Sequence, residues 1–173
     1  MDTMAHELAY FAGLIDGEGC ITIKRSGLGI KPKRYRRSPS YVFSLCLEMT
    51  DPRPIKAFCD YFGLTFNRNN SRWKKAPARW RYLFVAQSGR QKGIEILKAI
   101  LPYLKAKREE ADLAVEFYET CWPDHLVPGR NRKPVPQSLL DKRHDYYLRL
   151  QALKRRNWDQ YKIPERPVDR SDG

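Results

Sequence analysis

Two carboxylates, Asp16 and Glu18, lie on either side of Gly17 near the start of the chain. Segment 11–19 reads Phe-Ala-Gly-Leu-Ile-Asp-Gly-Glu-Gly, so glycines bracket the second acid where a helix would end. Hard cations such as Mg²⁺ prefer oxygen ligands, often one or two carboxylates with phosphate oxygens and water. Such cations can activate water and stabilise the phosphate during phosphodiester hydrolysis. An exposed carboxylate at this helix end suits that chemistry.

The helix that carries these acids, predicted over 6–16, has two unlike faces at 100° per residue. The bulky face holds Leu8, Phe11 and Ile15. The small face holds Ala9, Ala12, Gly13 and Asp16. Such a helix can bury the first face in its own core and offer the second to another helix at close range. The alternative is an ordinary amphipathic helix with a glycine stop; a strand-like run at 20–23 directly behind it favours the first interpretation.

Segment 11–19 resembles the motif that names the LAGLIDADG homing endonucleases. Six positions match letter for letter, namely Ala12, Gly13, Leu14, Ile15, Asp16 and Gly19, and the other three are close replacements. The resemblance covers roughly residues 5–120, and segment 101–107 (Leu-Pro-Tyr-Leu-Lys-Ala-Lys) is similar to a second family signature. One copy of the nonapeptide implies a homodimer, with the small helix face as the dimer interface.

The resemblance also implies roles for individual residues. Glu18 matches the essential metal-binding acid, although many members carry Asp there, and the Gly17 carbonyl would add a ligand. Asp16 matches an acid whose role we expect to be local and structural. Lys107 matches an active-site lysine, with a solvated helix start as the alternative and Lys105 as competitor. Asp51 matches a water-positioning residue, with a helix N-cap as an equal alternative.

Charge points to a polyanionic partner. Lys and Arg number 33 against 20 acids, a net charge of +13. Segments 24–37 and 67–82 hold seven and six basic residues and no acid. We therefore expect double-stranded DNA as partner. The DNA-binding residues predicted on the strands and in the two basic segments are Thr22, Lys24, Ser26, Lys33, Arg34, Arg36, Arg37, Ser44, Glu48, Arg68, Arg72, Lys74, Arg79 and Arg81, with Lys105 beside the active site.

Period-2 and period-3.6 patterns predict strands at 20–25, 41–49, 64–69 and 79–87 and helices at 53–62, 91–103, 106–120 and 137–156. The fold class is α+β, and the order αββαββα is that of the LAGLIDADG endonuclease fold, with a saddle-shaped antiparallel sheet and extra C-terminal helices. We expect a core domain at 1–127, a linker and packed C-terminal helix at 128–157, and a flexible polar tail at 158–173.

The four cysteines, Cys20, Cys46, Cys59 and Cys121, have no paired spacing and are expected to be reduced thiols. No signal peptide or membrane-length apolar run is found. We expect an intracellular protein, in the cytoplasm and nucleoid or in an organelle, without membrane or small-molecule cofactor.

These observations predict a Mg²⁺-dependent, site-specific endonuclease of the homing type, with Mn²⁺ as a substitute, that cuts a long pseudo-palindromic site. The alternative is a non-catalytic nucleic-acid binder on the same scaffold, either an intron-splicing maturase or a DNA-binding regulator. A basic RNA-binding protein of ribosomal type fits the charge but leaves the small helix face unexplained.

Overall fold

The computed structural model describes residues 3–26, 39–70, 82–88, 90–121 and 135–155. The chain begins α1 (Thr3–Glu18), β1 (Gly19–Ser26), β2 (Ser40–Met49) and α2 (Pro52–Phe62). It continues β3 (Phe66–Asn70), β4 (Tyr82–Ser88) and α3 (Arg90–Ile100), then the 3₁₀ turn η2 (Leu101–Tyr103), α4 (Arg108–Cys121) and α5 (Gln137–Lys154). The predicted order and the α+β class are confirmed.

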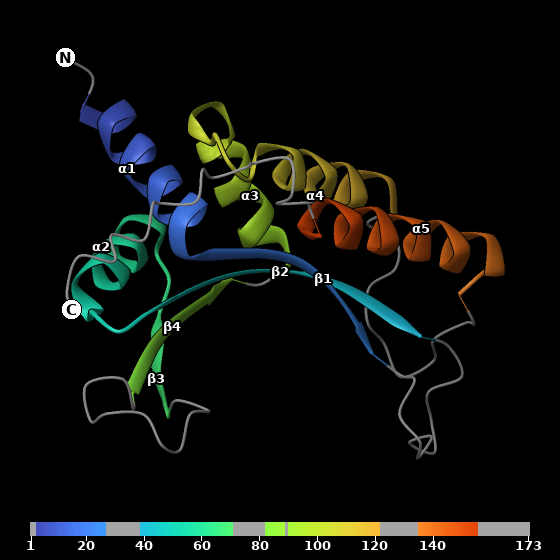
Figure 1. Ribbon diagram of the computed structural model, residues 1–173, viewed down its shortest axis with the longest axis horizontal. Coiled ribbons are helices and arrows are strands. Elements are labelled where there is room, and N and C mark those ends of the chain that lie inside the picture. The colour runs from blue at the N-terminus through green and yellow to red at the C-terminus, as the bar shows by residue number, and fades with distance from the viewer. Residues whose placement is uncertain (1–2, 27–38, 71–81, 89, 122–134, 156–173) are drawn as a thin grey trace, which may run out of the picture.

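The four strands form one antiparallel sheet in the order β1-β2-β4-β3, which makes β1 and β3 the edges. The sheet arches, and the helices lie on one side of it while the concave side carries none of the described helices (Figure 1). Strand alternation explains this arrangement, because Ile21 and Ile23 of β1 and Phe43, Leu45 and Leu47 of β2 all point to the helical side and are buried.

The helix α1 runs two residues further than predicted and ends at Glu18. Its glycines do not end it in the usual way, since among the described residues Gly63, at the end of α2, is the glycine with positive φ (65°). Gly19 is required for another reason. A Cβ there would lie 2.7 Å from both Cα and O of Ile15, too close for any side chain without moving backbone.

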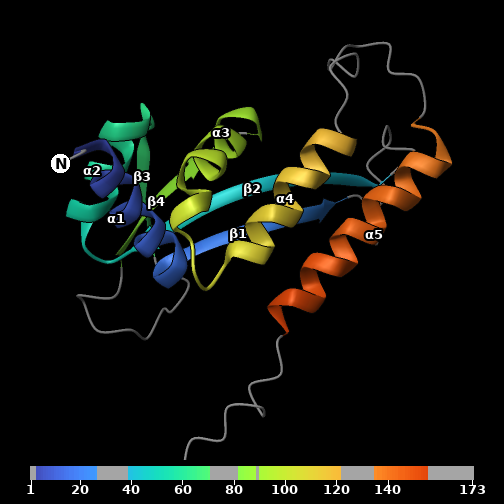
Figure 2. The same cartoon turned by 90° about the horizontal axis from the view of Figure 1, so that it is seen from above.

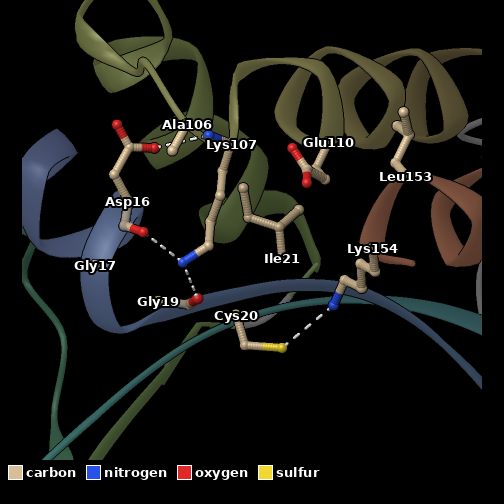
Figure 3. A pocket seen from close by; sticks show the side chains of 10 residues that line it. All are labelled: Asp16, Gly17, Gly19, Cys20, Ile21, Ala106, Lys107, Glu110, Leu153 and Lys154. Atoms are coloured by element: carbon tan, nitrogen blue, oxygen red, sulfur yellow. Dashed lines mark hydrogen bonds between the residues drawn. The ribbon is translucent and has the colours of Figure 1, made fainter. Parts of the chain in front are cut away.

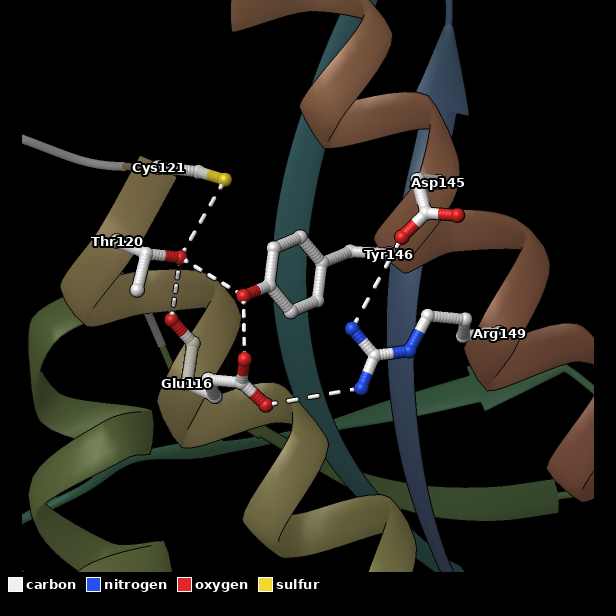
Figure 4. Close-up of polar contacts among 6 residues, drawn as sticks. All are labelled: Glu116, Thr120, Cys121, Asp145, Tyr146 and Arg149. Carbon is white, nitrogen blue, oxygen red and sulfur yellow. Dashed lines mark hydrogen bonds and ion pairs between the residues drawn. The ribbon is translucent and has the colours of Figure 1, made fainter.

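The C-terminal helix α5 belongs to the same core. Figure 2 shows it beside α4, over the end of the sheet. Tyr146 and Leu150 are buried in the core cluster, and the Tyr146 hydroxyl donates to Glu116 Oε1 of α4 at 2.6 Å (Figure 4). Buried Arg143 donates to the Cys121 carbonyl at 2.7 Å, which satisfies an acceptor at the end of α4. Polar and apolar contacts together fix α5 on the body of the protein.

None of the described helices combines the length and the apolarity needed to span a bilayer.

Candidate active site and DNA-facing surface

Asp16 joins the end of α1 to the start of α4. Its Oδ2 accepts from the Lys105 backbone N–H at 2.7 Å, and its Oδ1 accepts from the Lys107 backbone N–H at 2.8 Å. These N–H groups precede or open the first turn of α4, where backbone donors lack helical partners. The hydrogen bonds give Asp16 the local, structural role predicted for it. They also correct its placement on the dimer face, because its carboxylate is turned to its own chain.

Lys107 holds the end of α1. Its Nζ donates to the carbonyl oxygen of Ile15 at 2.8 Å. It also donates to the carbonyl oxygens of Asp16 at 2.8 Å and Gly19 at 2.9 Å (Figure 3). An ammonium has three protons, so these acceptors use its whole donor capacity. Burial lowers the pKa of Lys107, and the charge of Asp16 opposes that shift. The lysine therefore caps the end of α1 in this structure, a contact that neither sequence-based interpretation named, and its role at the phosphate stays a prediction.

Glu18 is the candidate metal ligand. It is the last residue of α1 and is exposed, and among the described residues no hydrogen bond or ion pair engages its carboxylate. Gly17 beside it is also exposed. The described part of the chain has no group of three or more His, Cys, Asp or Glu side chains placed to hold a metal. The carboxylate of Glu18 alone could thus supply one or two of the oxygen ligands that a hard divalent cation requires.

A cavity of about 500 Å³ opens beside these residues, at the junction of α1, β1, α4 and α5 (Figure 3). Its lining joins Gly17 and Gly19 with Cys20, Lys107 and Lys154. Cys20 and Lys154 were not singled out as site residues from the sequence. Their contribution depends on the packing of α5 against the start of β1, and no local pattern signals that packing.

The open face of the sheet carries several predicted DNA-binding side chains. Thr22 and Lys24 alternate with the buried isoleucines of β1 and so point to this face, and Glu48 does so on β2. Ser26 ends β1 and is exposed. The side chain of Lys105 is exposed as well. Thr22, Lys24 and Glu48 thus lie on the sheet face that carries none of the described helices, whereas Lys105 lies off the sheet, before α4.

Two predicted base-reading residues are not placed as expected in the sheet. Ser44, opposite Thr22 on the internal strand β2, is only 2% exposed and so is not accessible on the open face. Arg68 is exposed but lies opposite Phe84, which lies opposite Met49, so register places it on the helical side of the sheet. Asn67 takes the open face instead, opposite Val85 and hence in line with Glu48. The strand β3 begins at Phe66, later than predicted. The alternation of its residues was too weak to predict which side chains point to the open face.

Asp51 is an N-cap. Its Oδ1 accepts from the Arg53 backbone N–H at 2.9 Å, and the Arg53 guanidinium donates to both carboxylate oxygens. These hydrogen bonds lower the pKa of Asp51 to about 2. The capping interpretation accounts for the residue fully, and a water-positioning role finds no support in this geometry.

The predicted dimer face is only partly available. Ala12 is fully buried in the protomer's own core, which corrects its assignment to an interface. Ala9 and Gly13 are exposed, and a Cβ built at Gly13 would meet nothing within 4 Å. The exposed strip of α1 therefore runs through Ala9, Gly13 and Gly17, with Tyr10 beside it. The helical spacing predicted that Ala9 and Gly13 lie on one face of α1. The buried face of α1 is wider than the bulky residues indicated, because it includes Ala12.

Several predicted DNA-binding residues lie outside the described part of the chain, namely Lys33, Arg34, Arg36, Arg37, Arg72, Lys74, Arg79 and Arg81. Their assignment stays a prediction. The expected polar tail at 158–173 also lies outside it.

The architecture is α+β, with an arched four-stranded sheet, helices on one side of it and an exposed acid at the end of the first helix. The chain has the fold of the LAGLIDADG homing endonucleases. It is similar to I-CvuI in complex with the I-CreI target and Mg, with uncleaved DNA, at 17% identity and TM-score 0.63, over 87% of this chain and 83% of that one.

Two further structures show the same fold. An archaeal intron-encoded homing endonuclease, I-Vdi141I, complexed with DNA, is 11% identical with a TM-score of 0.65, over 88% of this chain and 87% of that one. The LAGLIDADG homing endonuclease I-GzeII with its DNA target is 14% identical with a TM-score of 0.58, over 81% of this chain and 43% of that one. No protein-family sequence model and no curated protein sequence matches the chain.

Proposed function

We propose that this protein is a site-specific DNA endonuclease that acts as a homodimer and hydrolyses phosphodiesters with a divalent cation. The observation that carries the proposal is the Glu18 carboxylate, exposed and unengaged by the described residues, at the point where α1 meets the open sheet face. The similar structures named above include proteins solved with DNA, which supports the partner. The net charge of +13 supports it independently.

The lengths of the similar structures support the dimer. The chain spans most of I-CvuI and I-Vdi141I but less than half of I-GzeII. A fold of this size thus exists both as a whole chain and as part of a chain about twice as long. A two-fold axis through the exposed strip of α1 would place the α1 helices of two copies side by side. Such an interface would use the same surface patch of both copies.

Within such a dimer each residue of the site has a defined task. Glu18 of each protomer would hold a divalent cation together with the Gly17 carbonyl and the DNA phosphates. When bound, that cation supplies activated water and charge neutralisation at the phosphate. Asp16 and Lys107 fix the turn on both sides of Glu18, so its carboxylate is positioned before DNA arrives. Thr22, Lys24 and Glu48 would face base edges in the groove, where Lys suits guanine and Glu accepts from cytosine.

The test is a Glu18→Gln variant on a target mapped from the DNA that flanks the gene. Gln retains the shape but loses the charge that holds the cation. We expect binding in Ca²⁺ to remain within a few-fold of the original protein and single-turnover cleavage in Mg²⁺ to fall by at least about 100-fold. Cleavage at an unchanged rate would remove Glu18 from the mechanism. Binding without cleavage by the unmodified protein would support the non-catalytic alternative, a maturase or regulator.

Gly13→Leu tests the dimer separately. Because a Cβ at Gly13 meets nothing in the protomer, the variant should fold normally. It should sediment as a monomer, even with DNA, and lose double-strand cleavage. Sedimentation of the unmodified protein as a monomer on its DNA would refute the dimer.

A further inference from the structure

A second lysine, Lys154 at the end of α5, reaches the cavity beside Glu18. Its Nζ lies 3.5 Å from Cys20 Sγ (Figure 3). A thiol sulfur is a weak acceptor, so this contact does not satisfy an ammonium. Apart from that sulfur, the described residues provide no hydrogen bond or ion pair to Lys154.

The position of Lys154 relative to the sheet is decisive. Cys20 is exposed and alternates with the buried Gly19 and Ile21, so its side chain points to the open face. The strand β1 is an edge of the sheet, and α5 packs on the helical side. The Lys154 ammonium therefore lies at the edge strand, 3.5 Å from a thiol that points to the open face.

The two lysines of the cavity differ in what they can still bind. Lys107 donates all its protons to three carbonyl oxygens at 2.8–2.9 Å, whereas Lys154 meets one weak acceptor. The thiol that Lys154 contacts belongs to a residue near the candidate metal ligand in the chain. Because Glu18 and Cys20 are two residues apart, their Cα atoms lie at most about 7.6 Å from each other.

We propose that Lys154 binds the DNA phosphate that lies next to Glu18 of the same protomer, and that it supplies the positive charge that Lys107 cannot. The inference rests on the proposed function. On DNA binding the ammonium exchanges the thiol for a phosphate oxygen, a charged and much stronger acceptor. A lysine held there stabilises negative charge that grows on the phosphate in the transition state.

The experiment compares Lys154→Met with Lys154→Arg and with Lys142→Met as matched control. Lys142 is an exposed lysine of the same helix that does not line the cavity. For Lys154→Met we expect the slope of log binding constant against log salt, measured in Ca²⁺, to fall by about 0.9 for each bound protomer. Single-turnover cleavage should fall by about 100-fold. Lys154→Arg should restore the slope, and Lys142→Met should change neither quantity.

A methylphosphonate scan of the central phosphates locates the contact. At one position, replacing the charged phosphate with the neutral methylphosphonate should abolish the difference in binding between the original protein and Lys154→Met. If slope and rate are unchanged in Lys154→Met while Glu18→Gln still abolishes cleavage, Lys154 has no such role and the proposed function stands. If Lys154→Met lowers the melting temperature and the rate but leaves the slope unchanged, the residue is structural and the inference fails. If the unmodified protein does not bind the mapped DNA, the proposed function itself fails.

Discussion

Replacing Lys107 with methionine should destabilise the fold, and this outcome separates a helix cap from a catalytic lysine. The variant removes three hydrogen bonds to the carbonyl oxygens of Ile15, Asp16 and Gly19 while it preserves the aliphatic stem. A hydrogen bond from a charged group contributes about 1.5–3 kcal/mol. Two effects make the total stabilisation smaller than the sum of three such hydrogen bonds. Burial of the ammonium is itself unfavourable, as its lowered pKa indicates, and the freed carbonyls at a helix end can regain water.

We therefore expect Lys107→Met to reduce the free energy of unfolding by about 2–4 kcal/mol. For a chain of this size that corresponds to a fall in melting temperature of about 4–16 °C. The matched control is Lys105→Met. The exposed side chain of Lys105 is lost there, but its backbone N–H still donates to Asp16, so the change should stay within about 0.5 kcal/mol.

The assay is thermal unfolding followed by circular dichroism, without DNA or added metal, alongside single-turnover cleavage. Cleavage by Lys107→Met should fall as well, because Glu18 loses the fixed turn that presents it. The reasoning is refuted if both lysine variants unfold at the same temperature while Lys107→Met alone fails to cut. That result would indicate that Lys107 acts directly on the phosphate during cleavage.

Three further predictions concern single positions. Gly19→Ala should cost about 1–3 kcal/mol by overpacking against backbone, whereas Gly17→Ala, which meets nothing, should be neutral or stabilising; urea denaturation compares them. The folded pKa of Asp51 is about 2, below its unfolded value, so the stability it adds is present above about pH 4 and is lost as pH falls through about 2. Asp51→Asn keeps an oxygen that can accept from the Arg53 backbone N–H but loses the charge, so it should lower the melting temperature at pH 7 and less at pH 2. An equal effect at both pH values would exclude a contribution from the carboxylate charge. Cys20 and Cys46 lie directly opposite, so diamide should link them in a disulfide that peptide mapping identifies; a one-residue slip would prevent it.

The order of elements could be predicted from the chain because period-2 and period-3.6 patterns are local. The cap of α2 shows how far such reasoning extends: Asp51 before a proline and Gly63 after the last helical residue both mark their boundaries correctly. The motif at 11–19 likewise located Glu18 and the structural role of Asp16. The residues that mark the ends of α2 and the acids of the motif are neighbours in the sequence, whereas the hydrogen-bond partners of Asp16 are not.

The sequence by itself thus determined the class of fold, the acid at the end of α1 and the alternation of β1. Tertiary structure decided which polar groups remain available. Lys107 is 91 residues from Asp16, and only folding brings its ammonium to the carbonyls that use it. Ser44 is buried within the folded chain, Ala12 is covered by the core, and Lys154 reaches Cys20 because α5 packs over an edge strand. Burial and hydrogen-bond partners are properties of distant segments in contact, so no local pattern contains them.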